Sequence, residues 1–176
     1  MCIFASPWHS SEIKTLVFEQ KTPFTVSEKF LDTFIEKAKS QMEKEEKSPV
    51  KKGLIEEHVI QTKLNHYYVE NPYGKKATRL DATLYLGMIP QNVESEVRGV
   101  LHDLFNPRHI SFHTFTLASF SAVRDIFKSE DSFVLIDVTS EVTDITLVFN
   151  GAILEIFSFP KGKNFLIREI ASKFNT

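Results

Sequence analysis

The most regular pattern of apolar and polar positions lies in the last third of the chain. Phe133 to Val138 is a short apolar run, and Ile145 to Phe149 and Ala152 to Phe159 alternate or run apolar on either side of Asn150-Gly151. An Asn-Gly pair between two such runs is the strongest short-range signal for a two-residue hairpin, with positive φ at both turn residues. The pattern therefore predicts three consecutive strands, the first of them buried, and then a helix that begins at Gly162.

Two earlier segments have the spacing of amphipathic helices. Thr25-Val-Ser-Glu28 has the form of a capping box, so a helix should begin there and bury one face. The apolar positions of that face are Phe30, Leu31, Phe34, Ile35 and Ala38. We interpret this Phe-rich stripe as core, and an exposed docking groove remains the alternative. Pro90-Gln-Asn92 begins the second helix, Val93 to Phe105. Its predicted apolar face consists of Val93, Val97, Val100, Leu101 and Leu104.

Other short apolar or alternating segments predict strands. They are Cys2 to Ala5, a half-buried strand through Ile13, Thr15 and Val17, Ile55 to Leu64 and Ala77 to Leu86. Tyr67 to Glu70 leads into an Asn71-Pro-Tyr-Gly74 turn between the last two strands, which should be antiparallel. The charged run from Lys39 to Lys52 predicts a solvated linker. Trp8 should pack at the corner after the first strand. The whole pattern predicts an α+β fold.

Composition narrows the functional classes. The chain has 176 residues, of which 42% are apolar and 25% charged, so it can bury a core. A net charge of −2 gives no basic footprint for nucleic acid. Cys2 is the single cysteine and predicts no disulfide, and no apolar window is long enough to span a bilayer, so we expect a cytoplasmic location. A core strand that begins directly at the initiator is a hint that the chain is part of a longer protein.

One carboxylate is placed for chemistry. Asp137 follows an apolar strand, a hydroxyl-rich turn comes next, and the predicted helix at Gly162 would complete one wall of a phosphate site. The alternative is structural, with Asp137 accepting backbone N–H bonds in the turn. His109 and His113 have a metal-binding spacing only on a helix, whereas their surroundings predict a strand, so we predict no metal site. No nucleophile signature surrounds the serines, and no catalytic residue is assigned.

These residues resemble a known motif. The segment from Asp137 to Asp144, followed by Asn150-Gly151 and the stretch Phe159 to Ala171, resembles the second phosphate motif of the actin-like ATPases. The resemblance is closest to the FtsA-type cell-division proteins, with the PilM-type pilus proteins as near relatives. The family motif is Asp-aliphatic-Gly-Gly-Gly-Thr-Thr-Asp, and a Gly-Gly pair opens its later helix. It implies an actin-like, ribonuclease H-like fold.

The match within this motif is partial. Asp137, Thr143 and Asp144 match the family pattern. Three family glycines are replaced, and Lys163 stands in place of the second later glycine. The resemblance implies that these positions would bind cofactor: Asp137, Thr139, Ser140, Thr143 and Gly162.

Earlier segments resemble the same family in the same order. Asn71-Pro-Tyr-Gly74 with Arg79-Leu-Asp81 is similar to the inserted subdomain 1C of the FtsA type, an SHS2 module, and Leu117-Ala-Ser119 is similar to the return into the first lobe. This implies a fragment with an SHS2 subdomain at 1–107, a return segment at 108–129 and the start of the second lobe at 130–176. The Asp-x-Gly hairpin of the first phosphate site and the adenosine-binding turn are absent from the sequence.

The resemblance implies a scaffold of the bacterial division machinery and not an enzyme in this chain. Its partners would be an FtsZ-type ring and further copies of itself, with only indirect membrane contact at the cytoplasmic face. Complete family members bind ATP with magnesium, whereas we expect this chain to bind no cofactor by itself. Two alternatives remain: a PilM-like role in type IV pilus assembly, and part of an active ATPase whose other elements lie outside this chain.

Overall fold

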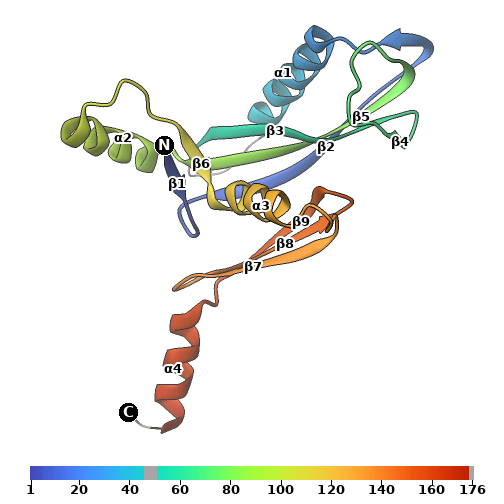
Figure 1. Cartoon of the computed structure of the whole chain (residues 1–176). Helices are drawn as coiled ribbons and strands as arrows, with labels where there is room; N and C mark the ends of the chain where they lie inside the picture. The colour runs from blue at the N-terminus through green and yellow to red at the C-terminus, as the bar shows by residue number, and fades with distance from the viewer. Residues whose placement is uncertain (46–50, 175–176) are drawn as a thin grey trace. The chain divides into compact units, whose positions relative to one another are not determined.

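The computed structural model describes residues 1–45 and 51–174, and the side chains of 41–45 are not described. Figure 1 shows its helices and strands. In chain order they are β1 (Cys2–Phe4), β2 (Ser10–Thr25), α1 (Glu28–Glu45), β3 (Lys52–Leu64), β4 (Tyr67–Tyr68), β5 (Lys76–Pro90), α2 (Gln91–Phe105), β6 (Phe112–Thr114), α3 (Phe115–Ile126), β7 (Phe133–Val138), β8 (Thr143–Phe149), β9 (Ala152–Phe159) and α4 (Lys163–Phe174). The α+β class is confirmed.

The strands form three sheets in two compact units. The sheet orders are β1-β6, β2-β5-β3-β4 and β7-β8-β9. The first unit comprises residues 1–13, 52–57 and 86–176, and the second comprises 14–51 and 58–85.

The second unit contains α1 and the larger parts of β2, β3 and β5, and Phe18 of β2 packs against Phe30 and Phe34 of α1. Its buried apolar side chains include Val26, Leu31, Ile35, Leu80, Leu84 and Tyr85. The predicted helix is present, but Ser27 caps it instead of Thr25, because Ser27 Oγ accepts a hydrogen bond from Phe30 N at 3.1 Å. In the predicted Asn-Pro-Tyr-Gly turn, Asn71 Oδ1 accepts from Tyr73 N at 3.0 Å and Gly74 has φ +76°.

The predicted linker from Lys39 to Lys52 is wrong at both ends. Helix α1 continues to Glu45, and β3 already begins at Lys52. The cause is local propensity, because Lys, Glu, Gln and Met all favour helix even where no apolar face continues. The centre of that predicted linker, residues 46–50, lies outside the described residues.

The first unit has a core between β1, β6 and α2. Phe4, Ile89 and Phe112 are buried together, and three residues of α2 pack against them: Val93, Val97 and Leu101. The predicted helix face is therefore too wide. Val100 and Leu104 are 56% and 70% exposed, since they lie beside the packed stripe of α2 and not on it. Trp8, expected to pack at a corner, is 58% exposed.

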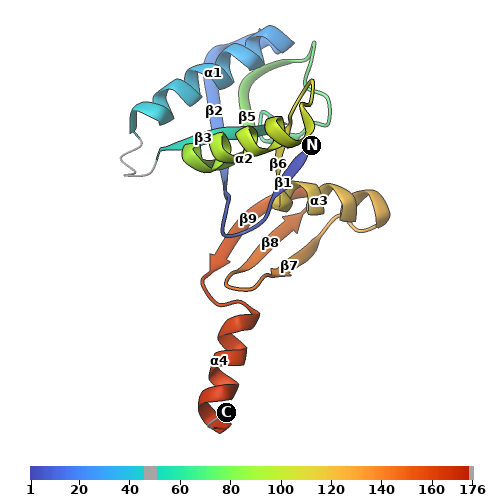
Figure 2. The same cartoon turned by 90° about the vertical axis from the view of Figure 1, so that its left-hand side faces the viewer.

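The sheet β7-β8-β9 agrees best with its prediction. Both its pairings are antiparallel, and Asn150 and Gly151 have φ +50° and +72°, so the positive-φ hairpin is confirmed. Helix α3 lies along one face of this sheet in both views (Figures 1 and 2), where Phe120 stacks on Phe133. The prediction that the first of these strands is buried is wrong, because Val134, Ile136 and Val138 are exposed on the other face.

Among the helices that the structure describes, none combines the length and the apolar character that a bilayer crossing requires.

Candidate functional site

The residues implied as a cofactor site lie near the end of β7, in the β7–β8 turn, at the start of β8 and directly before α4, all within the first unit. Thr139 closes the turn. Its N–H donates to Val142 O at 2.9 Å, its Oγ1 donates to the same carbonyl at 2.7 Å, and Val142 N donates to Thr139 Oγ1 at 3.2 Å. The hydroxyl that was expected to face a ligand therefore bonds within the turn itself.

The first turn of α4 is joined directly to this strand turn. Lys163 N donates to Thr139 O at 3.0 Å, and Asn164 N donates to Ser140 O at 2.9 Å. A Cβ at Gly162 would lie 2.5 Å from Thr139 O and 2.6 Å from Glu141 N. Glycine is therefore required here by the close approach of two backbone segments. We call this contact between Gly162–Asn164 and Thr139–Glu141 the turn–helix joint.

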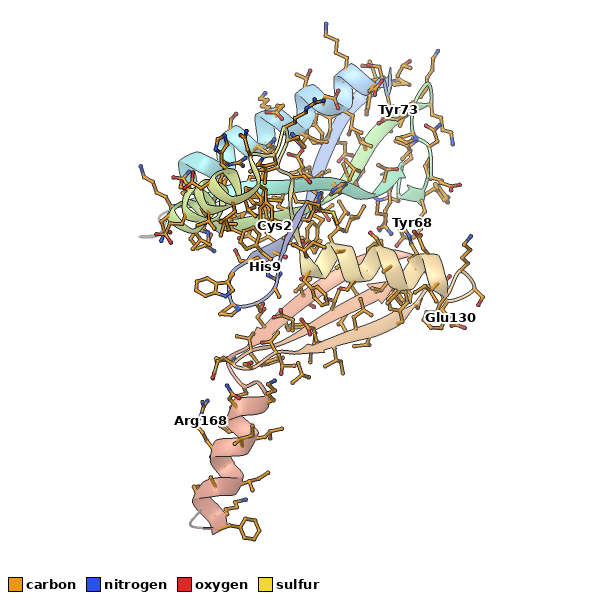
Figure 3. All side chains as sticks on the ribbon, turned by 60° about the vertical axis from the view of Figure 1, so that its left-hand side comes forward. Cys2, His9, Tyr68, Tyr73, Glu130 and Arg168 are labelled. Carbon is orange, nitrogen blue, oxygen red and sulfur yellow. The ribbon has the colours of Figure 1, made fainter. Side chains whose placement is uncertain are left out.

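Side chains reinforce the turn–helix joint from outside. Glu141 Oε1 accepts from Asn164 Nδ2 at 2.8 Å, and Glu141 Oε2 accepts from Arg168 Nη2 at 3.1 Å. Arg168 lies on α4 in Figure 3. Hydrogen bonds from Arg168 and then Asn164 lower the pKa of Glu141. Both charged groups are exposed, so the pair adds geometric definition more than stability.

Two aspartates face each other across the sheet next to the turn. Asp137 of β7 and Asp144 of β8 are directly opposite in register. Asp144 is buried and accepts hydrogen bonds from Ser6 Oγ at 2.5 Å and Ser158 Oγ at 2.6 Å. Burial, and secondarily the charge of Asp144, raise the pKa of Asp137, while His9 acts in the opposite direction.

His9 approaches these carboxylates from the loop between β1 and β2, where Figure 3 labels it. Its Nε2 is 3.0 Å from Thr116 Oγ1, within hydrogen-bond distance. Its Nδ1 is buried and makes no hydrogen bond of good geometry among the described residues. Burial lowers the pKa of His9, although the carbonyl of Ala5 and the carboxylates of Asp144, Asp137 and Glu56 oppose this.

The implied cofactor residues do not converge on one point. Asp137 lies on the face of the sheet that carries Asp144, whereas Thr143 is paired with Val138 and lies on the opposite face. Thr143 Oγ1 donates to Lys161 O at 2.7 Å. Ser140 is exposed at the tip of the turn. The sequence reasoning also missed Ser6, Ser158 and His9, and no sequence signal marks them, because the contact of Ser6 with Asp144 joins residues 138 positions apart.

A phosphate does not fit the start of α4 in this arrangement. Helix N-termini bind phosphate through free backbone N–H groups of the first turn. Here the N–H groups of Lys163 and Asn164 bond to the turn carbonyls, and Phe165 N bonds to Gly162 O. The carboxylate of Glu141 also stands at the joint. Among the described residues, no group of three or more His, Cys, Asp and Glu side chains has a metal-binding arrangement.

Comparisons with known proteins place the fold only. No family model matches the sequence, and no curated protein matches it. Among solved structures, the chain is similar to a PilM–PilN type IV pilus biogenesis complex, with a TM-score of 0.62 and 13% sequence identity. The match covers 94% of this chain and 44% of that chain, so this chain spans less than half of its structural neighbour. The likeness shows an α+β fold consistent with the actin-like class. It does not show the FtsA type or the SHS2 subdomain.

Proposed function

We propose that this chain is a protein-binding scaffold module of the PilM type, which takes part in an assembly through contacts with another protein. The observation that carries the proposal is the structural likeness over 94% of the chain to a protein found in a PilM–PilN complex. The partner that the likeness suggests is a PilN-type protein.

In this proposal, the former phosphate turn serves as a structural joint. The support comes from its hydrogen bonds, because Thr139, Ser140 and Glu141 bond to α4 and to the turn. A site that binds nucleotide would leave such groups for the ligand. The joint instead fixes the direction in which α4 leaves the sheet.

An FtsA-type division scaffold is the second candidate. It is favoured by Asp137, Thr143 and Asp144 at their motif positions and by the turn at Asn71, whose geometry the structure describes. In this case the partner would be an FtsZ-type filament in place of a PilN-type protein.

The two candidates are distinguished by a binding experiment with the full chain. The chain is immobilised and exposed separately to a PilN-type protein and to FtsZ-type filaments from the same organism. Saturable binding to the PilN-type protein alone, with a dissociation constant in the range of about 0.1–100 μM, supports the proposal. Binding to FtsZ-type filaments alone selects the second candidate, and binding to neither overturns both.

A further inference from the structure

A groove lined by aromatic side chains runs between β2 and α1 in the second unit. Its volume is about 350 Å³, and its lining residues are Phe18, Phe30, Thr33, Phe34, Lys37 and Ala38. We call it the aromatic groove. All six residues belong to the second unit, whereas the turn–helix joint belongs to the first. Its volume is at the lower end of the range of ligand pockets in proteins.

The phenylalanine rings form a connected surface. Phe18 lies 5.1 Å from Phe30 and 5.9 Å from Phe34 between ring centroids, both edge-on, and Phe24 packs behind at 4.9 Å from Phe18. These distances are typical of favourable aromatic pairs. The rings thus hold one another in place before any partner arrives, which reduces the entropy lost on binding.

These rings are not the main anchor of the helix. Leu31 and Ile35 are 3% and 5% exposed and hold the inner face of α1. The phenyl rings of Phe18, Phe30 and Phe34 remain only half-buried. The Phe-rich stripe therefore combines both sequence interpretations, because its Leu and Ile positions are core and its Phe positions line an open groove.

The polar groups at the rim of the groove indicate which charge a partner should carry. Thr33 Oγ1 already donates to Lys29 O at 2.7 Å. Lys37 is the charged member of the lining, and it makes no ion pair among the side chains that the structure describes. The neighbouring acid Glu36 pairs with Lys39 at 2.8 Å. A carboxylate on the partner would therefore find a complementary charge at one side of an apolar floor.

We propose that the aromatic groove binds a short peptide segment of a partner protein, one that carries a large apolar side chain close to an acidic residue. A polar small molecule does not fit, because such ligands need several converging polar groups and the lining supplies only Lys37 and Thr33, whose hydroxyl already donates to Lys29 O. An apolar anchor with one flanking charge is how amphipathic peptide segments enter hydrophobic grooves. The proposal does not depend on whether the chain is PilM-like or FtsA-like.

The test selects peptides and then maps them. A phage-displayed library of random peptides of about twelve residues is selected against the full chain, with the Thr33→Trp variant as counter-selection. Thr33 is exposed, so the indole fills the groove without removing a buried side chain, and circular dichroism checks that the variant is folded. The expected result is a family of peptides that share a large apolar residue near Asp or Glu.

An enriched peptide is then synthesised with a fluorescein label and its affinity measured by fluorescence anisotropy. Lys37→Glu should weaken binding about tenfold, whereas the charge-matched Lys29→Glu on the same helix should change it less than about twofold. A family of peptides that binds Thr33→Trp or Lys37→Glu as tightly as the unmodified chain overturns the proposal. So does the absence of any enriched family.

Two further outcomes also overturn it. If decanoate binds in the groove and no peptide does, the groove is an acyl-chain site. If sedimentation shows dimers that Thr33→Trp abolishes, the groove is occupied by a second copy of this chain.

Discussion

Asp137 and Asp144 are direct cross-strand partners, yet only Asp144 accepts side-chain hydrogen bonds from Ser6 and Ser158. The two carboxylates therefore differ in environment although they share one position in the sheet. Burial, and secondarily the neighbouring carboxylate of Asp144, disfavour the charged form of Asp137 and raise its pKa.

The first prediction concerns the pH dependence of stability. The pKa of Asp137 is raised in the folded state above its ordinary value of 3.8. The free energy of unfolding therefore falls as pH rises from the ordinary pKa through the raised pKa of the folded state, because the unfolded chain ionises more readily. Asp137→Asn should therefore increase the free energy of unfolding at about pH 7 by roughly 0.5 kcal/mol, a small value because the group is partly solvent-screened. The gain should disappear at about pH 2.5, well below the ordinary pKa, where the carboxyl is protonated in both states. Urea unfolding at both pH values measures it, and an equal gain at both would contradict the assignment.

The second prediction concerns the turn–helix joint. Gly162→Ala forces a methyl group against the backbone of Thr139 and Glu141, so it should destabilise the joint by about 2 kcal/mol and speed amide exchange in α4. Hydrogen exchange by mass spectrometry measures the effect. The matched control is Gly99→Ala in α2, where a Cβ meets no atom within 4 Å. That change should stabilise by about 0.5–1 kcal/mol, since alanine favours helix. Unchanged exchange in α4 of Gly162→Ala would show that the joint is not tight in solution.

The third prediction is that this chain shows no measurable affinity for Mg-ATP, with a dissociation constant weaker than about 1 mM. The N–H groups at the start of α4 are already bonded, and Glu141 brings negative charge to the same place. Isothermal titration calorimetry of the full chain measures it. Binding with a micromolar dissociation constant that is lost in Asp137→Ala would contradict the prediction and show that the chain has a nucleotide site.

The fourth prediction concerns the open face of β7-β8-β9. Val134, Ile136 and Val138 are 55%, 63% and 52% exposed in one row, and apolar surface of this kind promotes association. We expect concentration-dependent self-association in analytical ultracentrifugation. Ile136→Lys should weaken it about tenfold by placing a charge in the middle of the row. Ser129→Lys adds the same charge outside the sheet and should have no effect. A strict monomer at all concentrations would contradict this expectation.

The sequence predicted best where local chemistry decides structure. The bounds of β7 and β9 and the positive φ of Asn150 and Gly151 follow from apolar alternation and from one turn type that demands those residues. The sequence failed where tertiary packing decides. Val100 and Leu104 satisfy the helical period as well as Leu101 does, but only Leu101 meets the core of Phe4, Ile89 and Phe112.

The sequence likewise predicted one part of the candidate site and missed another. The sequence located the β7–β8 turn and the glycine before α4, because both are short-range features. It could not show that the first-turn N–H groups of α4 bond to the carbonyls of Thr139 and Ser140, since that depends on how closely two backbones approach. The polar groups that the sequence pattern suggested for a ligand are therefore used in hydrogen bonds within the chain itself.

The close backbone contact at Gly162 also couples the orientation of α4 to the β7–β8 turn. A helix of twelve residues is about 18 Å long, at 1.5 Å per residue. With its first turn held by two backbone hydrogen bonds to β7-β8, a rotation of about 10° at the joint displaces the far end by about 3 Å. A partner bound to the end of α4 would therefore be displaced when the β7–β8 turn moves. The displacement would be larger at that end than at the turn, because the helix moves as one body.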